Sequence, residues 1–161
     1  MADQFVTMHI CRRFPKVRPG TITRLRGSVV NNGTLAHIAL TSLELDQHLI
    51  QNSPALADAL VVARAEMAAM PLQQLDRYGW LVDHPQPPAD AFEAIVGAVF
   101  IDCRADMDVV YGVLERVLQP ALEQLTVDMP ADPPSRLLQL QQRMGCRDFR
   151  LSCVTAHALL S

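Results

Sequence analysis

Residues 90–102 have the sequence DAFEAIVGAVFID. A helix turns by 100° per residue, so a helix over these residues has one apolar face. Asp90, Glu93 and Gly97 lie on a different face. The apolar face consists of Phe92, Ile95, Val96, Val99 and Phe100. A face this continuous is typical of a helix that its neighbours bury. We therefore predict an all-α domain with the helix from Asp90 to about Asp102 at its centre.

Asp90 and Glu93 lie one helical turn apart, and two interpretations follow. Two carboxylates near a residue without a side chain leave room for hydrated Mg²⁺, which binds few carboxylates and keeps several waters. Alternatively, Asp90 follows a proline-rich loop as an N-cap would, and Glu93 completes a pattern similar to a capping box. Spacing alone favours capping, because it is the more common use of such a pair.

Breaker and cap residues divide the rest of the chain into further helices. Upstream, the expected elements are the end of a helix at 5–10, a helix capped by Thr21, one restarting at Thr34 and one opened by Ser53-Pro54. Downstream, they are a helix from Asp106 that Pro120 should kink or end, a helix from Ser135 to Met144 closed by Gly145, and a strand at 149–154.

Proline-rich loops at 84–88 and 129–134 divide the chain. We predict that residues 1–128 form one domain, a size sufficient for a hydrophobic core. Residues 129–161 are expected to form a linker followed by a short helix and strand, a pair that resembles the start of a double-stranded-RNA-binding domain.

Composition favours packed helices, since 50% of the 161 residues are apolar but only 5% are aromatic. The four cysteines form no CxxC pair, which indicates reduced thiols. No apolar run approaches the ~20 residues that span a bilayer, so we expect no membrane partner. An intracellular location follows as an expectation, with cytoplasm and nucleus not distinguished.

Charge is unevenly distributed along the chain. The net charge is −3, yet no acid occurs between Asp3 and Glu44, where there are six basic residues: Arg12, Arg13, Lys16, Arg18, Arg24 and Arg26. From Glu44 onward there are 8 basic and 16 acidic residues. Such a chain can offer a basic surface to phosphates and keep acids elsewhere for metal ions, although an acid-free stretch can also arise by chance.

Three segments together resemble the ribonuclease III family. DAFEAIVGAVFID is similar to the family motif in which Asp-x-Phe-Glu-Ala leads into Gly-Ala and ends at Asp. Residues 19–26, PGTITRLR, and 29–36, VVNNGTLA, resemble its Gly-x-Leu-Thr-x-Leu-Arg and Val-Asn-Asn segments, in the same order. The helix at Ser53 and the approach from Pro85 to Asp90 resemble the Dicer-like branch.

The resemblance implies a helical endonuclease domain that pairs with a second ribonuclease III domain, as a homodimer or within a longer chain. It implies Mg²⁺-dependent cleavage of double-stranded RNA, with Mn²⁺ as an alternative ion, in RNA processing or RNA silencing. Four acidic side chains hold the metal in the family. By motif match, Asp90 and Glu93 stand at the two later positions, as catalytic residues and metal ligands.

The chain departs from the family pattern in three places. The earlier acidic pair belongs to a Glu-Arg-Leu-Glu-Phe-Leu-Gly-Asp type motif that does not occur here, so the chain is expected to start inside the family's first conserved helix. Gln86 stands where Dicer-like domains often have Lys, and Ala89 replaces a common Gly. We therefore expect little or no cleavage by this chain alone.

For RNA contact we nominate Lys16, Arg18, Arg24 and Arg26, with Asn31 and Asn32 as weaker candidates. Arg24 and Arg26 are about 200° apart on a helix and cannot both face the same way. Contacts would be to phosphates and 2′-hydroxyls, because A-form RNA hides its base edges in a deep groove. We expect low sequence specificity.

Two functional alternatives remain beside the endoribonuclease. A catalytically incomplete copy of the same fold would dimerise and bind RNA as a scaffold, and a Glu-x-x-x-x-x-x-Asp helix upstream of Met1 would distinguish the enzyme from it. A generic helical interaction domain explains the composition but not three motifs in register. For the endoribonuclease and for the scaffold, we expect self-association or a partner domain.

Overall fold

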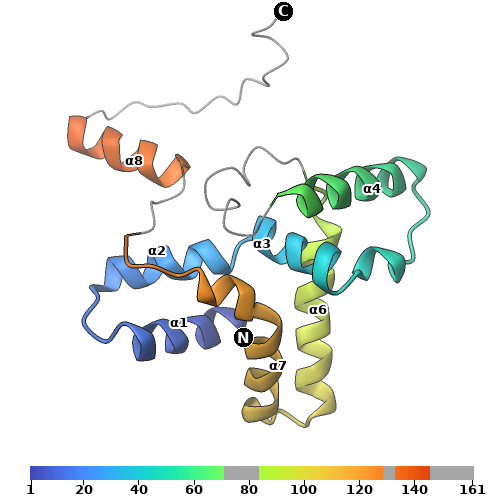
Figure 1. Ribbon diagram of the computed structural model, residues 1–161, viewed down its shortest axis with the longest axis horizontal. Helices are drawn as coiled ribbons and strands as arrows, with labels where there is room; N and C mark the ends of the chain where they lie inside the picture. Colours follow the sequence, from blue (N-terminus) through green and yellow to red (C-terminus); the bar gives the residue numbers. More distant parts are fainter. Residues whose placement is uncertain (71–83, 129–132, 146–161) are drawn as a thin grey trace, which may run out of the picture. The chain divides into compact units, whose positions relative to one another are not determined.

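The computed structural model describes residues 1–70, 84–128 and 133–145 (Figure 1). It divides the chain into two compact units, Met1–Pro130 and Ala131–Ser161. The expected strand at 149–154 lies outside the described residues, and the boundary at residue 128 stays a prediction. Among the described helices, none is long and apolar enough to cross a membrane.

Every element described in the first unit is helical, which confirms the all-α prediction. The elements are α1 (Ala2–Arg13), α2 (Pro19–Val29), α3 (Asn32–His37), the π-helical turn η1 (Ile38–Ser42), the 3₁₀ turn η2 (Leu45–Gln47), α4 (Pro54–Ala69), α6 (Pro87–Asp102) and α7 (Met107–Glu123). The second unit contains α8 (Pro133–Met144), close to the predicted helix, and Gly145 follows it with φ +69° in the predicted C′ role.

Helix starts follow local chemistry, with two corrections. Ser53 caps α4 as predicted, its Oγ accepting from the Leu56 N–H at 3.3 Å. The prediction of Thr21 as an N-cap is wrong, because α2 begins at Pro19, whose missing N–H suits the first helical position. The predicted restart at Thr34 is also wrong: Asn31 is the N-cap of α3, and its Oδ1 accepts from the Thr34 N–H at 2.9 Å.

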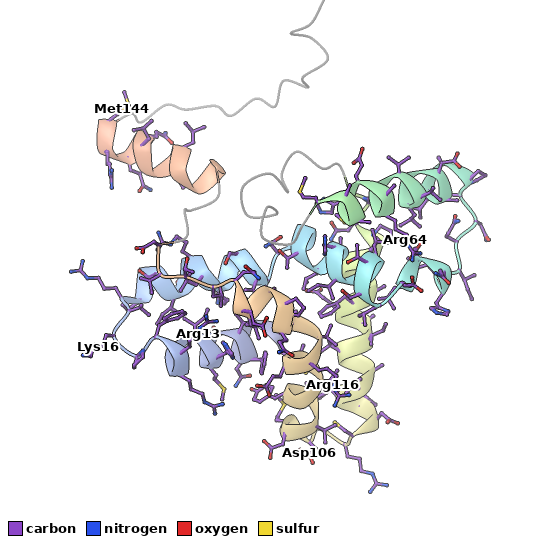
Figure 2. All side chains as sticks on the ribbon, in the orientation of Figure 1. Arg13, Lys16, Arg64, Asp106, Arg116 and Met144 are labelled. Atoms are coloured by element: carbon purple, nitrogen blue, oxygen red, sulfur yellow. The ribbon has the colours of Figure 1, made fainter. Side chains whose placement is uncertain are left out.

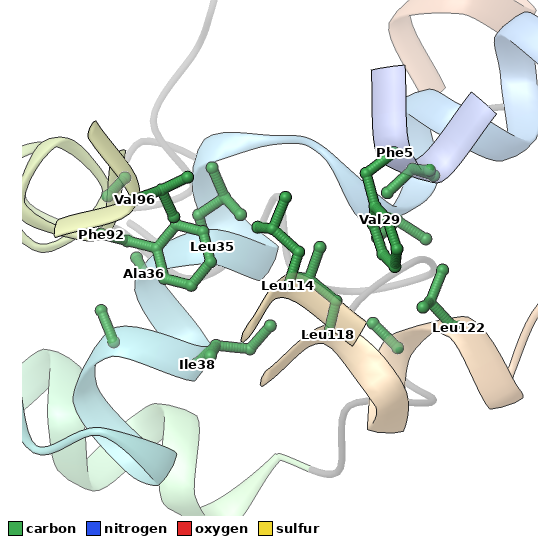
Figure 3. Close-up of a cluster of buried hydrophobic side chains, with 14 of the residues drawn as sticks. Phe5, Val29, Leu35, Ala36, Ile38, Phe92, Val96, Leu114, Leu118 and Leu122 are labelled. Atoms are coloured by element: carbon green, nitrogen blue, oxygen red, sulfur yellow. The ribbon is translucent and has the colours of Figure 1, made fainter. Parts of the chain in front are cut away.

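The core of the first unit centres on α3 and η1. Leu35, Ala36, Ile38, Ala39 and Leu40 are each at most 1% exposed, and elements α2, α4, α6 and α7 all contact this segment. Figure 3 shows side chains from α6 and α7 reaching it from two sides. The predicted central place of α6 is therefore wrong, because α6 covers this segment from one side.

Helix α6 buries the face around Phe92 and Val96, which are 1% and 7% exposed. Val99 and Phe100 are partly buried against the same core. Ile95 was expected on the apolar face but is 41% exposed. The sequence pattern overestimated the width of the face because no other described element covers that side of the helix.

Helix α7 begins as expected and, of the two outcomes expected at Pro120, does not end there. Asp106 is its N-cap, with Oδ1 accepting from the N–H groups of Asp108 and Val109 at 3.0 and 3.4 Å. Pro120 does not end the helix, which continues to Glu123. Pro120 is exposed, so water can satisfy the carbonyl one turn earlier that loses its N–H partner.

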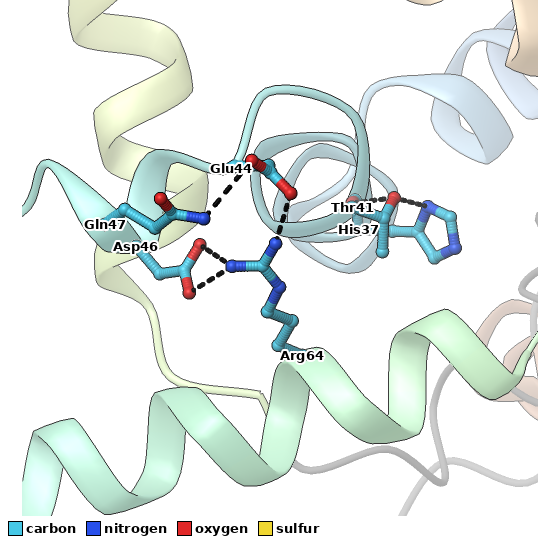
Figure 4. A network of polar contacts seen from close by, with 6 residues as sticks. All are labelled: His37, Thr41, Glu44, Asp46, Gln47 and Arg64. Carbon is cyan, nitrogen blue, oxygen red and sulfur yellow. Dashed lines mark hydrogen bonds and ion pairs between the residues drawn. The ribbon is translucent and has the colours of Figure 1, made fainter.

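A polar network fastens the segment after η1 to α4 (Figure 4). Nη1 of Arg64 donates to both carboxylate oxygens of Asp46, at 2.9 and 3.1 Å, and Nη2 pairs with Glu44. These contacts raise the pKa of Arg64, the hydrogen bond that it donates to Asp46 contributing most. Glu44 has a left-handed φ of 50°, a conformation that this pairing helps to hold.

The half-buried ring of His37 lies between two hydrogen-bonding groups. Its Nε2 lies 3.2 Å from the Met70 carbonyl. Its Nδ1 lies 3.2 Å from Thr41 Oγ1, the contact drawn in Figure 4. Burial lowers the pKa of His37 and outweighs the backbone hydrogen bonds, which act in the opposite direction. Burial, aided by Arg13, also lowers the pKa of His9.

Stability should therefore fall as the pH is lowered from 7.5 to 5.5. A histidine in the unfolded chain takes up its proton near pH 6.5, before the folded state does, so acid stabilises the unfolded state. We expect the fall in Tm between these two pH values to be smaller in His37→Gln than in the wild type. His48→Gln, at an exposed position, is the control, and an unchanged pH dependence in His37→Gln would contradict the assignment.

Candidate active site at the start of helix α6

Helix α6 begins four residues earlier than the capping interpretation requires. Gln86 is its N-cap position, without a side-chain cap hydrogen bond, and Pro87 and Pro88 occupy the first turn. Prolines suit these positions because the first N–H groups of a helix have no intrahelical partner. Asp90 is thus the fourth residue of the helix and caps nothing, so the capping interpretation of Asp90 and Glu93 is wrong.

Both carboxylates lie on the surface of α6, one turn apart. Buried Ala89, Phe92 and Val96 hold the opposite face of the helix on the core. Within the described part of the chain, Glu93 makes no hydrogen bond or ion pair, and Asp90 uses only its Oδ1. A Cβ built on Gly97 would meet nothing within 4 Å, so the space next to the acids is open.

A chain of hydrogen bonds links Asp90 to the start of α3. Gln86 Nε2 donates to Asp90 Oδ1 at 2.9 Å, and Asn32 Nδ2 donates to Gln86 Oε1 at 3.0 Å. Sequence reasoning noted Gln86 only as a departure from Lys and missed this link. The i, i+4 spacing of Gln86 and Asp90 was the available signal, whereas Asn32 is 54 residues away.

The two acids have no third metal-binding neighbour among the described residues. No group of three His, Cys, Asp or Glu side chains that could hold a metal ion occurs there. Asp3, the acid nearest the missing motif, pairs instead with Arg26, its Oδ1 lying 3.2 Å from Nε. The chemistry available at the start of α6 is therefore two oxygen ligands on one rigid helix, which suits a hydrated hard cation.

Three arginines of the basic stretch, Arg13, Arg24 and Arg26, make contacts within the fold. Arg24 Nη2 donates to the Val127 carbonyl at 2.8 Å while its buried Nε has no hydrogen-bond partner, and Arg26 pairs with Asp3. Arg13 Nη1 similarly donates to the Leu122 carbonyl at 2.6 Å. Long-range partners of this kind cannot be read from sequence, since they join residues about a hundred positions apart.

The remaining RNA candidates differ in how free they are. Asn31 holds the start of α3: its Nδ2 donates to the carbonyls of Gly27 and Ser28 at 3.0 Å. Lys16, labelled in Figure 2, and Arg18 are both exposed in the segment before α2. Neither makes an ion pair within the described residues. Of the nominated cations, these two are the most available to a ligand.

Helix α2 separates this basic turn from the acids. Its 11 residues span roughly 16 Å at about 1.5 Å per residue, from Arg18 before its start to Val29 at its end. Asn32 follows immediately and contacts Gln86, which contacts Asp90. Cations and carboxylates thus lie towards opposite ends of α2.

The ribonuclease III domain family model matches residues 2–104. This match covers α1 to α6 and includes all of the nominated site residues. Together with the helical fold and the acids at the start of α6, it shows that the chain belongs to the ribonuclease III family.

Similar curated proteins place the chain in the Dicer-like branch of this endoribonuclease family. The chain is 27% identical over 157 residues to rice Endoribonuclease Dicer homolog 2b, covering 96% of the chain and 11% of that protein. It is 30% identical over 154 residues to Arabidopsis Endoribonuclease Dicer homolog 3, covering 94% and 9%. It is 28% identical over 151 residues to Drosophila Endoribonuclease Dcr-1, covering 86% of the chain and 7% of that protein. The chain spans about a tenth of the length of these relatives.

Proposed function

We propose that this chain is a double-stranded RNA endoribonuclease domain that contributes Asp90 and Glu93 to a Mg²⁺ site, with Mn²⁺ as an alternative ion. The observation that carries the proposal is a pair of exposed carboxylates one turn apart, neither used as a cap, on a helix anchored in the core. By similarity to the Dicer relatives, the reaction would belong to RNA processing or RNA silencing.

The residues fit the ion they would hold. Mg²⁺ prefers oxygen ligands, commonly one or two carboxylates completed by water, and Asp90 and Glu93 supply two. Bound there, the ion would provide an activated water and offset charge on the phosphate. Asp90 and Glu93 would orient it, and the buried Phe92 between them keeps their backbone in place.

Binding of Mn²⁺, followed by electron paramagnetic resonance, tests the site. The wild type should bind one ion weakly, and Asp90→Ala with Glu93→Ala should raise its dissociation constant at least ~10-fold because both charged ligands are lost. Asp102→Ala with Asp108→Ala is the matched control, since it removes two other exposed acids from α6 and α7. Equal Mn²⁺ binding by the wild type and the first variant would refute the proposal.

For the RNA surface we propose Lys16, Arg18, Arg24, Arg26, Asn31 and Asn32, with Lys16 and Arg18 contributing most because they are exposed and unpaired in the described structure. A duplex lying along α2 would meet the basic turn at one end and the acids past the other. Phosphate and 2′-hydroxyl contacts would give affinity without sequence selection.

We propose a second ribonuclease III domain, in another copy or in a longer chain, as the protein partner. Apolar side chains remain exposed on the far half of α6 and the start of α7: Ile95 is 41%, Ile101 78% and Val109 46% exposed. Ile101 also lines a shallow depression with Ala98, Val99 and Asp102. Exposed apolar groups of this kind mark protein interaction surfaces.

Sedimentation equilibrium tests the partner proposal. The chain should self-associate at tens of micromolar, and Ile101→Asp should weaken the dimer ~10-fold or more by placing a charge in an apolar contact. Val61→Asp is the control, because Val61 is a similarly exposed apolar residue, 69% exposed, on a different helix, α4. A monomer at high concentration, or an equal effect of both variants, would count against the α6 surface.

The second candidate function is a catalytically incomplete scaffold that dimerises and binds RNA. The absence of a third acidic, His or Cys neighbour of Asp90 and Glu93 within the described residues favours it. Both functions require RNA affinity and a partner, so only cleavage distinguishes them.

A further inference from the structure

The link between Asn32, Gln86 and Asp90 is the polar contact closest to the proposed metal site. It spans two elements, since Asn32 is the first residue of α3 and Gln86 directly precedes α6. All three side chains are exposed, so burial does not require them to bond with one another. Their pairing therefore calls for another explanation than the satisfaction of buried polar groups.

The chain of bonds has a direction that the side-chain chemistry sets. Asp90 can only accept, so the Gln86 amide must turn its nitrogen towards it, at 2.9 Å. The Gln86 oxygen then faces Asn32 Nδ2, a donor, at 3.0 Å. A flipped Gln86 amide would place two oxygens against each other at Asp90, so the carboxylate of Asp90 selects this orientation.

The far end of the link is rigid. The neighbouring Asn31 ties the start of α3 down through four hydrogen bonds, to Gly27, Ser28 and twice to Thr34, all between 2.9 and 3.0 Å. Leu35 and Ala36 then bury the helix in the core. Asn32 thus presents its amide from a fixed backbone.

We propose that Asn32 and Gln86 are positioning residues, which hold Oδ1 of Asp90 so that its other oxygen is kept oriented for the metal ion. The inference rests on the proposed function and deepens it. Gln86 supplies a donor without a charge, so it can orient the carboxylate without neutralising it, as a cation at this position would. Groups that orient a ligand in this way commonly strengthen metal binding.

Mn²⁺ affinity of the 161-residue chain tests the inference. Gln86→Met, which keeps length but loses the donor, should weaken binding about threefold to tenfold, the low end for such groups because these are exposed. Asn32→Ala should weaken it less, and the double variant should bind no more weakly than Gln86→Met alone, because both act through one contact. The matched control is Gln119→Met, since Gln119 Nε2 donates to Glu123 Oε1 at 2.8 Å with the same i, i+4 spacing on α7.

Each outcome has one meaning. Absence of Mn²⁺ binding to the wild type would overturn the proposed function itself. Binding by the wild type that Gln86→Met leaves within twofold, or strengthens, would overturn only the positioning role. Additive losses for Asn32→Ala and Gln86→Met would also overturn it, because they would show two independent effects. Melting temperatures of all variants, which a merely structural link would change without changing Mn²⁺ affinity, complete the test.

Discussion

Phe92→Ala is expected to lower the free energy of unfolding by about 3–5 kcal/mol, the usual cost of deleting a buried aromatic ring. Phe92 is 1% exposed, and its ring lies beside Leu35 and Ala36 of α3 (Figure 3). A small domain is stabilised by roughly 5–15 kcal/mol in total, so the loss would be a large fraction. Urea denaturation followed by circular dichroism measures it.

The control for this prediction lies on the same helix. Ile95→Ala removes an apolar side chain that is 41% exposed, so it should cost less than ~1 kcal/mol. A loss in Phe92→Ala as small as that in Ile95→Ala would show that α6 is not anchored through Phe92. The acids Asp90 and Glu93 would then lack the rigid support proposed for them.

Cleavage of double-stranded RNA by this chain alone is expected to be little or none in Mg²⁺. The described structure offers the ion two carboxylates from a single helix and no third ligand. Mg²⁺ sheds water reluctantly and would be held loosely. Misplacement by even ~1 Å costs on the order of 10²-fold in rate. The assay incubates a long RNA duplex with the chain, with and without Mg²⁺.

The Asp90→Ala, Glu93→Ala double variant gives the background rate for this assay, and the wild type should cut at or near that rate. Robust Mg²⁺-dependent cutting that the double variant abolishes would contradict the prediction. It would mean that another acid completes the site, and Asp3 would be the first to test, after release from Arg26.

Affinity for the same duplex should persist and fall with added salt, because Lys16 and Arg18 remain available to phosphates. Replacing both by alanine should reduce the slope of log K against log salt by about 2, since each phosphate contact contributes roughly 1. Arg104→Ala with Arg116→Ala makes the same change in charge at the α6–α7 end of the domain and should leave the slope unchanged.

Local signals predicted most of the helices but not their arrangement. Ser53-Pro54, Asp106 and Gly145 act as cap or stop residues whose effects extend only a few residues along the chain, so sequence was sufficient. For Pro120 the sequence left two outcomes open, a kink or an end, and the structure excludes the end. Thr21 misled because Pro19 had already started the helix. The central place of α3 and η1 depends on packing between distant segments, which periodicity does not report.

Sequence by itself determined the class of protein: three motifs in order indicated the ribonuclease III family, and Asp90 and Glu93 emerged from one of them. Only the tertiary structure decided how these residues are used. Asp90 is not an N-cap, and Gln86 connects it to Asn32 by hydrogen bonds. Arg24 donates to the Val127 carbonyl, and Arg26 pairs with Asp3. The physical reason is range: caps and helical stripes act within a few residues, whereas hydrogen bonds and ion pairs across the fold depend on which distant segments meet.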